Sequence, residues 1–508
     1  MKFHFTAPGD PYVHPGLKRS FSCGDHNAFF TGSYVTCAAP ERRCTEGRKL
    51  MTYDLVIRGV HAYAPEDLGI VDVAVSGERI AEIAPHISGS AERTIDGTGK
   101  ILIPGLIETH AHMSMPFAGT KTMNNFFDGT RAGAFGGVTT LIDFAQQING
   151  ISLRGSLRDR LEEAKDRCAV DYGFHITLTG TDAQTLAEIP SLCEDGYTSF
   201  KLHTTYKGGG LYIDTKGLEQ SFAAIAACGG IATVHAENDD MIQAAMDRLI
   251  AQGKTDAVYF PEYKPDEAEA EAVDRCIRIA EQTGCKLLIR HISSQEAAHS
   301  ILAAQRRGSP VYAETCPQYL AFTREVYAQE NGRDFILHPP IRGAEDREAI
   351  WEAICSGIKI TLGTDDCGFY RSQKRMFTTF YEVPGGLPGI ETRLMATYGL
   401  GVDSGRISLP RLVDMASTMP AKLYGLYPKK GVLQAGSDAD MVLLNPEKKT
   451  VIHAENLHEM SDYTPFEGME ASVALEKTFL RGKTIVDNGQ YLGCAGDGIL
   501  LKRGLPAE

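Results

Sequence analysis

Short apolar runs alternate with loop and helical patterns through the middle of the chain. Runs of about four to eight apolar residues are typical of strands buried on both faces of a parallel sheet, whose crossovers are usually helices. A helical pattern from Asp266 to Gln282, closed by a Thr-Gly stop, is one such crossover. The pattern predicts eight strands: Ile101–Glu108, Thr139–Phe144, Gly173–Leu178, Thr198–His203, Ile231–Ala236, Lys286–Ile292, Val311–Thr315 and Lys359–Gly363. We therefore predict an α/β fold that closes as a (β/α)8 TIM barrel over residues 104–432.

Two segments that bracket this region have an all-β texture instead. They contain the following short predicted strands: Tyr53–Arg58, Ile70–Ser76, Ile80–Ile83, Asp438–Leu444 and Ser472–Val486. We predict a small β-sandwich built from both segments, residues 51–103 and 433–490, followed by a C-terminal arm at 491–508. Residues 1–50 lack either periodicity, so we expect a disordered leader or an upstream extension of a reading frame that begins at Met51.

Composition narrows the class of protein. The chain has 508 residues and is 43% apolar, which is enough for a sizeable core. Its 51 basic residues against 65 acidic ones give a net charge of −14, whereas a nucleic acid or an anionic membrane selects the opposite sign. No run of 18 apolar residues occurs, so no membrane-spanning helix is expected. The expected partners are small molecules and other subunits.

The cysteines bear on the cellular compartment. Twelve cysteines are scattered along the chain without a repeated spacing, and the N-terminus has no basic-then-apolar signal pattern. An oxidised secretory scaffold is therefore disfavoured. We expect a cytoplasmic protein whose cysteines are buried or surface thiols.

Several predicted strands end in residues that bind metals. His110 and His112 close the first strand, and residues two apart in an extended segment point to the same side. The fifth, sixth and eighth strands end near His235, His291 and Asp365. Because the carboxyl ends of barrel strands meet at one mouth, these side chains are predicted to converge there. Imidazole and carboxylate together favour a divalent transition metal.

The fourth strand carries Lys201 between two apolar residues. An unpaired ammonium in the barrel lining would be costly, and a cation among four histidines would repel a metal. A neutral lysine can instead react with CO2 to give an N-carboxy group. That group is an anion able to bridge two metal ions, and the alternative at this position is a lysine that extends its ammonium to solvent or pairs with an acid.

Together these residues resemble the binuclear amidohydrolase superfamily. Four segments are similar to one branch of it, the hydantoinase and dihydropyrimidinase family of cyclic amide hydrolases: Pro104-Gly-Leu-Ile-Glu-Thr-His-Ala-His-Met-Ser-Met-Pro-Phe117, Gly129-Thr-Arg-Ala-Gly-Ala-Phe-Gly-Gly-Val-Thr-Thr140, Glu314-Thr-Cys-Pro-Gln-Tyr319 and Phe466-Glu-Gly-Met469. The resemblance runs in order from about Tyr53 to Arg503 and leaves residues 1–50 uncovered.

The resemblance implies a set of ligands for two divalent ions, with zinc as the default metal. His110, His112 and Asp365 would hold the more buried ion, and His235 and His291 the more exposed one. Carboxylated Lys201 would bridge both ions. The family likeness also implies a homotetramer or homodimer, with the C-terminal arm reaching a neighbouring subunit.

The implied reaction is hydrolysis of a cyclic C–N bond in a hydantoin- or dihydropyrimidine-type ring. Two metals would share a hydroxide as the nucleophile. Asp365 would shuttle its proton to the departing nitrogen, and Tyr206 would stabilise the oxyanion.

The sequence departs from the family pattern around the substrate. His338 stands where the family usually has a serine that contacts the cyclic imide, and Gly385 follows Pro384 where the family often has asparagine. Phe117 matches an apolar gate position, whereas His203 and Gly210 replace bulky apolar residues. We expect Tyr206, His338, Gly385, Phe117 and His203 to contact substrate, and we predict a roomier, more polar pocket suited to a polar or anionic substituent.

Two alternatives stay open at this point. Allantoinases and other cyclic imide hydrolases share the same ligands and differ chiefly in their substrate loops. A non-catalytic scaffold of the dihydropyrimidinase-like group would keep the barrel without metal, although such proteins have typically lost several ligands and this chain has the complete set. A nucleic-acid-binding role is disfavoured by the net charge of −14.

Overall fold

The computed structural model describes residues 52–117 and 119–507, and the predicted leader at 1–50 lies outside them. Within these ranges an eight-stranded parallel sheet runs in the order β15-β14-β13-β12-β11-β10-β9-β6. Its strands are β6 (Leu106–Glu108), β9 (Val138–Gln146), β10 (Asp171–Thr177), β11 (Ser199–His203), β12 (Ile231–His235), β13 (Lys286–Ile289), β14 (Val311–Thr315) and β15 (Ile360–Leu362). Almost every residue of these strands is buried, as expected for apolar runs covered on both faces. The predicted barrel is confirmed.

One predicted strand divides between two sheets. The run expected at Ile101–Glu108 is β5 (Ile101–Pro104), which belongs to a second sheet, and β6, which opens the barrel. Gly105 joins them, and a Cβ there would lie only 2.2 Å from Thr139 Oγ1 on β9. The close approach of the Thr139 side chain to the backbone at this point therefore requires glycine.

The first and last barrel strands are joined by side-chain and backbone bonds. Ala111 and Asp366 form a parallel bridge just beyond β6 and β15. Arg393, which is fully buried, donates from Nη1 to Ile107 O at 3.1 Å and to Leu362 O at 2.7 Å. The same nitrogen lies 3.2 Å from Glu108 Oε2, so a buried ion pair sits in the seam. Burial raises the pKa of Glu108 to about 7, although Arg393 opposes the shift.

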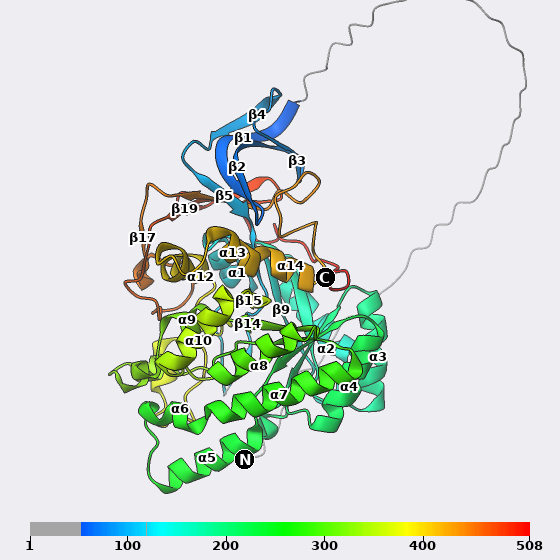
Figure 1. Cartoon of the computed structure of the whole chain (residues 1–508), viewed down its shortest axis with the longest axis vertical. Coiled ribbons are helices and arrows are strands. Elements are labelled where there is room, and N and C mark those ends of the chain that lie inside the picture. The colour runs from blue at the N-terminus through cyan, green and yellow to red at the C-terminus, as the bar shows by residue number, and fades with distance from the viewer. Residues whose placement is uncertain (1–51, 118, 508) are drawn as a thin grey trace, which may run out of the picture. The chain divides into compact units, whose positions relative to one another are not determined.

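Helices surround the barrel, and Figure 1 shows the green helices α4, α7 and α8 packed on its outside. The helix predicted from Asp266 is α7, and it ends at Thr283 before Gly284, which has a left-handed backbone. The helices are α1 (Phe126–Phe135), α2 (Leu153–Ala164), α3 (Ala183–Glu194), α4 (Thr215–Ala227), α5 (Asp239–Ala251), α6 (Phe260–Tyr263), α7 (Asp266–Thr283), α8 (Gln295–Arg306), α9 (Pro317–Ala321), α10 (Ala344–Cys355), α11 (Arg371–Arg375), α12 (Arg393–Thr397), α13 (Leu409–Val413) and α14 (Met419–Leu423). In the described ranges no helix is both long and apolar enough to cross a membrane.

Strands from both terminal segments form a second, nine-stranded sheet, as expected. Its order is β21-β20-β19-β16-β5-β1-β2-β3, with β4 paired to β1. Its strands besides β5 are β1 (Thr52–Tyr63), β2 (Asp67–Ser76), β3 (Arg79–Ala84), β4 (Ser90–Asp96), β16 (Met441–Asn445), β19 (Ala474–Leu480), β20 (Lys483–Asp487) and β21 (Gln490–Tyr491). Two hairpins lie elsewhere: β7 (Pro116–Phe117) with β8 (Thr120–Lys121), and β17 (Thr450–Val451) with β18 (Glu470–Ala471). A separate apolar cluster of Leu55, Val73, Leu443 and Phe479 fills this sheet's core.

A buried ion cluster ties the two sheets together. Lys430 Nζ lies 2.7 Å from Asp171 Oδ2 at the start of β10, and it also pairs with Asp438 and Asp440 next to β16. Burial alone would lower the pKa of Lys430, but Asp440 and Asp171 raise it. The Lys430 ammonium thus lies among three aspartate carboxylates that would otherwise resemble a cation-binding site.

The C-terminal arm lies along the barrel of its own chain. Leu501 N donates to Tyr172 O at 2.8 Å, and Tyr172 N donates to Ile499 O at 3.0 Å. The buried Arg503 donates to Phe174 O at 2.6 Å. These bonds attach the arm to β10 of its own chain, and the expected contact of the arm with a neighbouring subunit stays a prediction.

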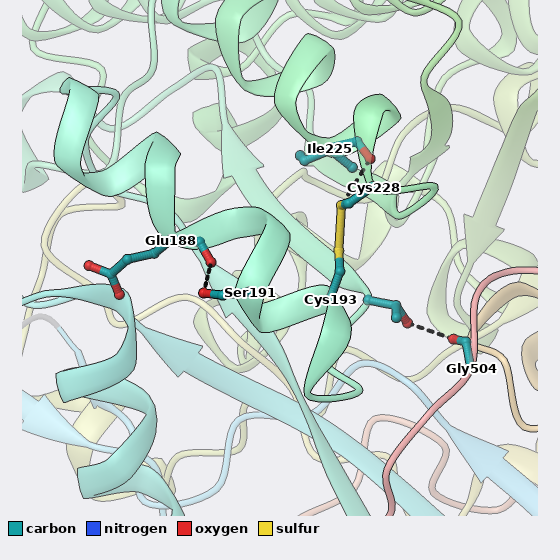
Figure 2. The surroundings of a disulfide bond; sticks show 7 residues. Glu188, Ser191, Cys193, Ile225, Cys228 and Gly504 are labelled. Carbon is teal, nitrogen blue, oxygen red and sulfur yellow. Dashed lines mark hydrogen bonds between the residues drawn. A yellow bond between two sulfur atoms is a disulfide. The ribbon is translucent and has the colours of Figure 1, made fainter.

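One pair of cysteines departs from the expected free thiols. Cys193 near the end of α3 and Cys228 after α4 form a disulfide, which Figure 2 shows between the two helices. Thr198 Oγ1, five residues after Cys193, donates to Gly504 O of the arm at 2.9 Å. The prediction was wrong for this pair because the two residues are 35 positions apart and only the packing of α3 on α4 brings them together. Seven other described cysteines are free.

We expect Arg393→Met to destabilise the barrel seam. The substitution removes the partner of buried Glu108 and two carbonyl contacts, and breaking a buried ion pair costs about 3–5 kcal/mol. The urea midpoint of unfolding should fall accordingly. Arg158→Met is the matched control, because the Arg158 side chain is 79% exposed. Equal midpoints for both variants would contradict a structural role for the seam.

Candidate metal centre

All six predicted ligand residues meet at the carboxyl end of the barrel strands. His110 and His112 follow β6, Lys201 lies in β11 and His235 ends β12. His291 and Asp365 follow β13 and β15 by two and three residues. Together they line one cavity of about 320 Å³. The parallel direction of the strands therefore gathers side chains separated by up to 255 positions, from His110 to Asp365.

A carboxylate oxygen forms the meeting point of two imidazoles. Asp365 Oδ1 lies 3.0 Å from His110 Nε2 and 3.1 Å from His112 Nε2. Ligand atoms of His110, His291 and Asp365 all lie within 4.8 Å of one another. The His291 ring in turn stands at 4.5 Å from the His235 ring, edge to face. This spacing is that of donors arranged around a small ion.

The backbone is strained where two of these residues leave their strands. His291 has φ 37° and Asp365 has φ 53°, values that side chains other than glycine rarely adopt. Each costs of the order of 1–3 kcal/mol. Neighbouring bonds hold both turns, because Ile292 N donates to Glu314 O at 2.7 Å and Asp366 N donates to His110 O at 3.2 Å. Such strain gathers at functional sites because it aims side chains that a regular strand could not.

Two buried glutamates orient the imidazoles from behind. Glu314 Oε1 lies 2.5 Å from His110 Nδ1, and its other oxygen accepts from Arg290 Nη1 at 2.6 Å. The contact with Glu314 assigns the imidazole proton of His110 to Nδ1, the nitrogen that faces the glutamate. The lone pair of the other nitrogen then points at the cavity. His110 therefore presents Nε2 to the site.

Glu237 supports the other side of the site in the same way. Its Oε2 lies 2.5 Å from His235 Nε2 and 2.5 Å from Lys264 Nζ, so His235 presents Nδ1 instead. Sequence reasoning missed Glu237, Lys264 and Arg290, and it quoted Glu314 without a role. The signal available for Glu237 was a charged residue two positions after a strand-end histidine; Lys264 carries no local signal.

Burial disfavours positive charge on Lys201 and on three of the imidazoles. It lowers the pKa of Lys201 to about 7, and the guanidinium of Arg290 adds to the effect. It also lowers the pKa of His110, His235 and His291 well below the usual value. Burial would raise the pKa of Asp365, but the imidazoles of His110 and His112 hold it below its ordinary range. The site thus combines a carboxylate with three imidazoles that burial keeps neutral and a lysine whose amine is neutral in a large share of molecules at neutral pH.

Four of the five expected substrate residues line the same cavity: Tyr206, His203, His338 and Gly385. The side chain of Phe117 lies outside what the structure describes, although Pro116 beside it lines the cavity. The sequence predicted a roomier pocket at Gly210, but the residues that line the cavity there are its neighbours Gly209 and Leu211. Leu211 therefore restores part of the apolar surface that the sequence analysis expected to be absent.

His338 and Gly385 are packed directly on one another. A Cβ at Gly385 would lie 2.5 Å from His338 Nε2, so the imidazole occupies the space of a side chain at 385. Burial, aided by Lys264, lowers the pKa of His338 to about 3, which keeps the ring neutral. Lys374 and Gly386 N each donate at 2.9 Å to Ile336 O and fix the loop that carries His338.

Comparison with known proteins places this geometry in a family. The sequence profile of the amidohydrolase family matches residues 101–485. The D-hydantoinase of Geobacillus stearothermophilus is 36% identical over 442 residues, covering 86% of this chain and 94% of that protein. The D-phenylhydantoinase of Escherichia coli O1:K1 / APEC is 35% identical over 452 residues, covering 88% and 96%. The crystal structure of dihydropyrimidinase from Brevibacillus agri NCHU1002 superposes with a TM-score of 0.87 at 36% identity, covering 89% and 99%.

The chain belongs to the amidohydrolase family and, within it, to the hydantoinase and dihydropyrimidinase branch. It is therefore a cyclic amidohydrolase, as the sequence resemblance implied. The family and the grouped ligand-type side chains together indicate a binuclear metal site. The residues fit such ions, because neutral imidazoles and a carboxylate converge with their lone pairs directed at one cavity.

We expect Glu314→Gln to weaken metal binding. The variant loses the charge that balances Arg290 and holds His110 by Nδ1, and losses of this kind typically cost about 10- to 100-fold in metal affinity. Competition with a chelator, followed by metal analysis, measures the change. Glu296→Gln on α8 is the control because Glu296 is exposed. Unchanged affinity in Glu314→Gln would rule out an orienting role for Glu314.

Proposed function

We propose that this chain hydrolyses a C–N bond in a hydantoin- or dihydropyrimidine-type ring with two divalent metal ions. The observation that carries the proposal is the convergence of His110 Nε2 and His112 Nε2 on Asp365 Oδ1, at 3.0 and 3.1 Å, in a cavity that also contains Lys201. The relatives named hydantoinase and dihydropyrimidinase, which align along most of the chain, support the choice of ring.

The ligands divide between two ions in this proposal. His110, His112 and Asp365 would hold one ion, and His235 and His291 the other. Lys201, as its N6-carboxy derivative, would reach both. Zinc is the default for nitrogen and oxygen ligands of this kind.

Lys201 is suited to carboxylation by its environment. With a pKa lowered to about 7, a large share of its amine is neutral at neutral pH. The neutral Nζ attacks CO2, so that an N–C bond forms and one proton leaves to solvent. The product carries a negative charge that the surrounding neutral donors lack, and two oxygens available as ligands. The reaction also removes the cost of a buried amine that makes no ion pair with a described carboxylate.

The chain's own groups would move protons and stabilise charge. When bound, the two ions would lower the pKa of a shared water from about 15.7 toward about 7 and so supply the nucleophile. Asp365 accepts the proton released during attack on the ring carbonyl. It then returns that proton to the ring nitrogen as the C–N bond breaks, a contribution of roughly 10²–10⁴-fold. Tyr206 donates its hydroxyl proton in a hydrogen bond to the carbonyl oxygen as charge develops there.

The side chains around the ring favour a polar substituent in the proposed pocket. His203 and His338 line the cavity as neutral rings, since burial lowers the pKa of both. A neutral imidazole can donate or accept one hydrogen bond, so a hydroxyl, amide or carboxylate substituent finds a partner. Leu211 and Phe144 line the cavity as well, and they would pack on the substrate ring itself.

Three further predictions from the sequence are part of this proposal. The protein would be a homodimer or homotetramer and would be cytoplasmic. Its chain would divide into a β-sandwich formed by residues 51–103 and 433–490, a barrel at 104–432 and a C-terminal arm at 491–508.

The test is a ring-opening assay of metal-loaded protein with dihydrouracil, hydantoin, 5-substituted hydantoins, allantoin and a cyclic imide. We expect turnover of hydantoin or dihydrouracil, and Lys201→Ala should abolish it because the bridge is lost. Short carboxylic acids should partly restore the variant by supplying the missing carboxylate. Allantoin as the preferred substrate would favour the allantoinase alternative.

The control for this assay is Lys448→Ala, which changes an exposed lysine far from the cavity lining. It should match the parent protein in rate and metal content. A flat result across the whole panel with two metals bound, or full activity in Lys201→Ala, would refute the proposal. Turnover of 5-phenylhydantoin far above polar hydantoins would refute only the polar pocket.

We expect His338 and Gly385 to behave as one unit in substrate selection. Gly385→Ala places a Cβ on His338 Nε2 and displaces the ring, which should lower kcat/KM by about 10- to 100-fold. His338→Ser vacates that space, so the double variant should recover part of the loss caused by Gly385→Ala. The measurement is kcat/KM over the same panel. Losses that simply add in the double variant would show that the two positions act independently.

A further inference from the structure

The backbone of Tyr206 is held in an unfavourable conformation. Its φ of 68° and ψ of 42° lie in the left-handed region, which aromatic residues rarely adopt. The ring is nevertheless placed in the cavity, 5.2 Å from the His235 ring and 6.1 Å from the His338 ring. A residue that must aim a hydroxyl at a reacting carbonyl needs something outside itself to maintain this backbone.

One carboxylate oxygen contacts both neighbours of Tyr206. Asp239 Oδ1 accepts from Thr205 Oγ1 at 3.0 Å and from Lys207 N at 3.3 Å. Asp239 is the first residue of α5, and Asn238 caps that helix by accepting from the backbone N–H groups of residues 240 and 241. The acceptor oxygen is therefore carried by a fixed helix end while it holds the chain immediately before and after Tyr206.

The segment preceding Tyr206 is attached to the β12 strand end. Thr204 N donates to His235 O at 3.1 Å, and Thr204 Oγ1 donates to Glu237 O at 2.8 Å. These bonds fix the chain up to one residue before Thr205. They also explain why Asp239, four residues after His235, can reach the Tyr206 turn.

The segment following Tyr206 has much less support. It continues as Gly208-Gly209-Gly210, and a Cβ built on Gly208 would meet nothing within 4 Å. Gly209 N donates to Tyr206 O at 2.9 Å, which closes the turn on itself without attaching it to the barrel. On the far side of the turn, the exposed Lys207 side chain pairs with Asp240, and the bond from Lys207 N to Asp239 holds the backbone itself to α5.

We propose that Asp239 is a positioning residue for Tyr206. By accepting from both flanking residues on a single oxygen, it holds the left-handed turn that directs the Tyr206 hydroxyl at the substrate carbonyl. The inference rests on the role of Tyr206 in the proposed function. It adds a residue that contacts no proposed metal ligand and whose loss should change the reaction step rather than metal loading.

The first test compares Asp239→Ala with Asp239→Asn in the metal-loaded enzyme. The alanine variant loses both bonds, so kcat should fall about 10- to 100-fold with little change in KM, because oxyanion contacts strengthen in the transition state. The asparagine variant keeps an acceptor oxygen at the same place and should retain most of the activity. Both variants should hold two metal ions per chain.

Two further variants separate this role from a general loss of folding. Asp240→Asn is the control, because exposed Asp240 pairs only with the Lys207 side chain and should leave kcat unchanged. Thr205→Val is isosteric and removes one of the two bonds, so an intermediate loss is expected. If Asp239→Ala fails to fold, Thr205→Val alone decides: parental kcat in that variant would overturn the inference.

A double-variant cycle with Tyr206→Phe gives the decisive outcome. Tyr206→Phe should lower kcat by about 10²–10³-fold, as loss of one oxyanion donor does. Adding Asp239→Ala should then cost almost nothing more. An inactive Tyr206→Phe beside a fully active Asp239→Ala would overturn only this inference, as would losses that multiply in the double variant. A fully active Tyr206→Phe would overturn the proposed role of the tyrosine and the inference with it.

Discussion

The site depends on burying nitrogen-rich side chains without leaving them charged. Lys201 lines one cavity together with His110, His235 and His291, and the guanidinium of Arg290 disfavours further positive charge on Lys201. Burial answers this by lowering their pKa values, so that the cavity presents lone pairs rather than cations. A neutral amine is also the form that reacts with CO2. The same physical cause therefore prepares both the metal donors and the proposed bridge.

Carboxylates behind the cavity hold this arrangement in one geometry. Glu314 faces His110 and Arg290, and Glu237 faces His235 and Lys264, so each acid is shared between one donor ring and one cation. Buried pairs of this kind add little net stability, but they are costly to break and so fix geometry. The seam between β6 and β15 contains a buried pair of the same kind, Glu108 with Arg393, so the loss of Arg393 is expected to destabilise it.

The barrel and the convergence of six side chains at its mouth could be predicted from the sequence because their signals are local. Val311–Thr315 is an apolar run whose predicted bounds match β14. Histidines and an aspartate at the strand ends indicated which end of the barrel carries the site. The features that could not be predicted depend on contacts between residues far apart in the sequence. Gly105 divides a strand because Thr139 lies against it, Glu314 acquires its role from a histidine 204 positions away, and Cys193 meets Cys228 only through helix packing. No periodicity or spacing in one sequence encodes such pairs.

The proposed metal donors and the proposed substrate contacts lie on different parts of the fold. The sequence therefore indicated how the donors converge, but for the substrate residues it indicated only which ones line the cavity. Most donors sit on strand ends whose register the sheet determines, whereas Tyr206 lies in a turn and His338 and Gly385 lie on loops. A loop residue acquires its position from whatever packs on it: Asp239 beside Tyr206, and an imidazole in the space above Gly385. Changes at such contacts can therefore alter the accepted ring while the donor set stays intact. The substrate preference of this enzyme therefore depends on pairs of loop residues. The His338 ring can take its position only because residue 385 has no side chain.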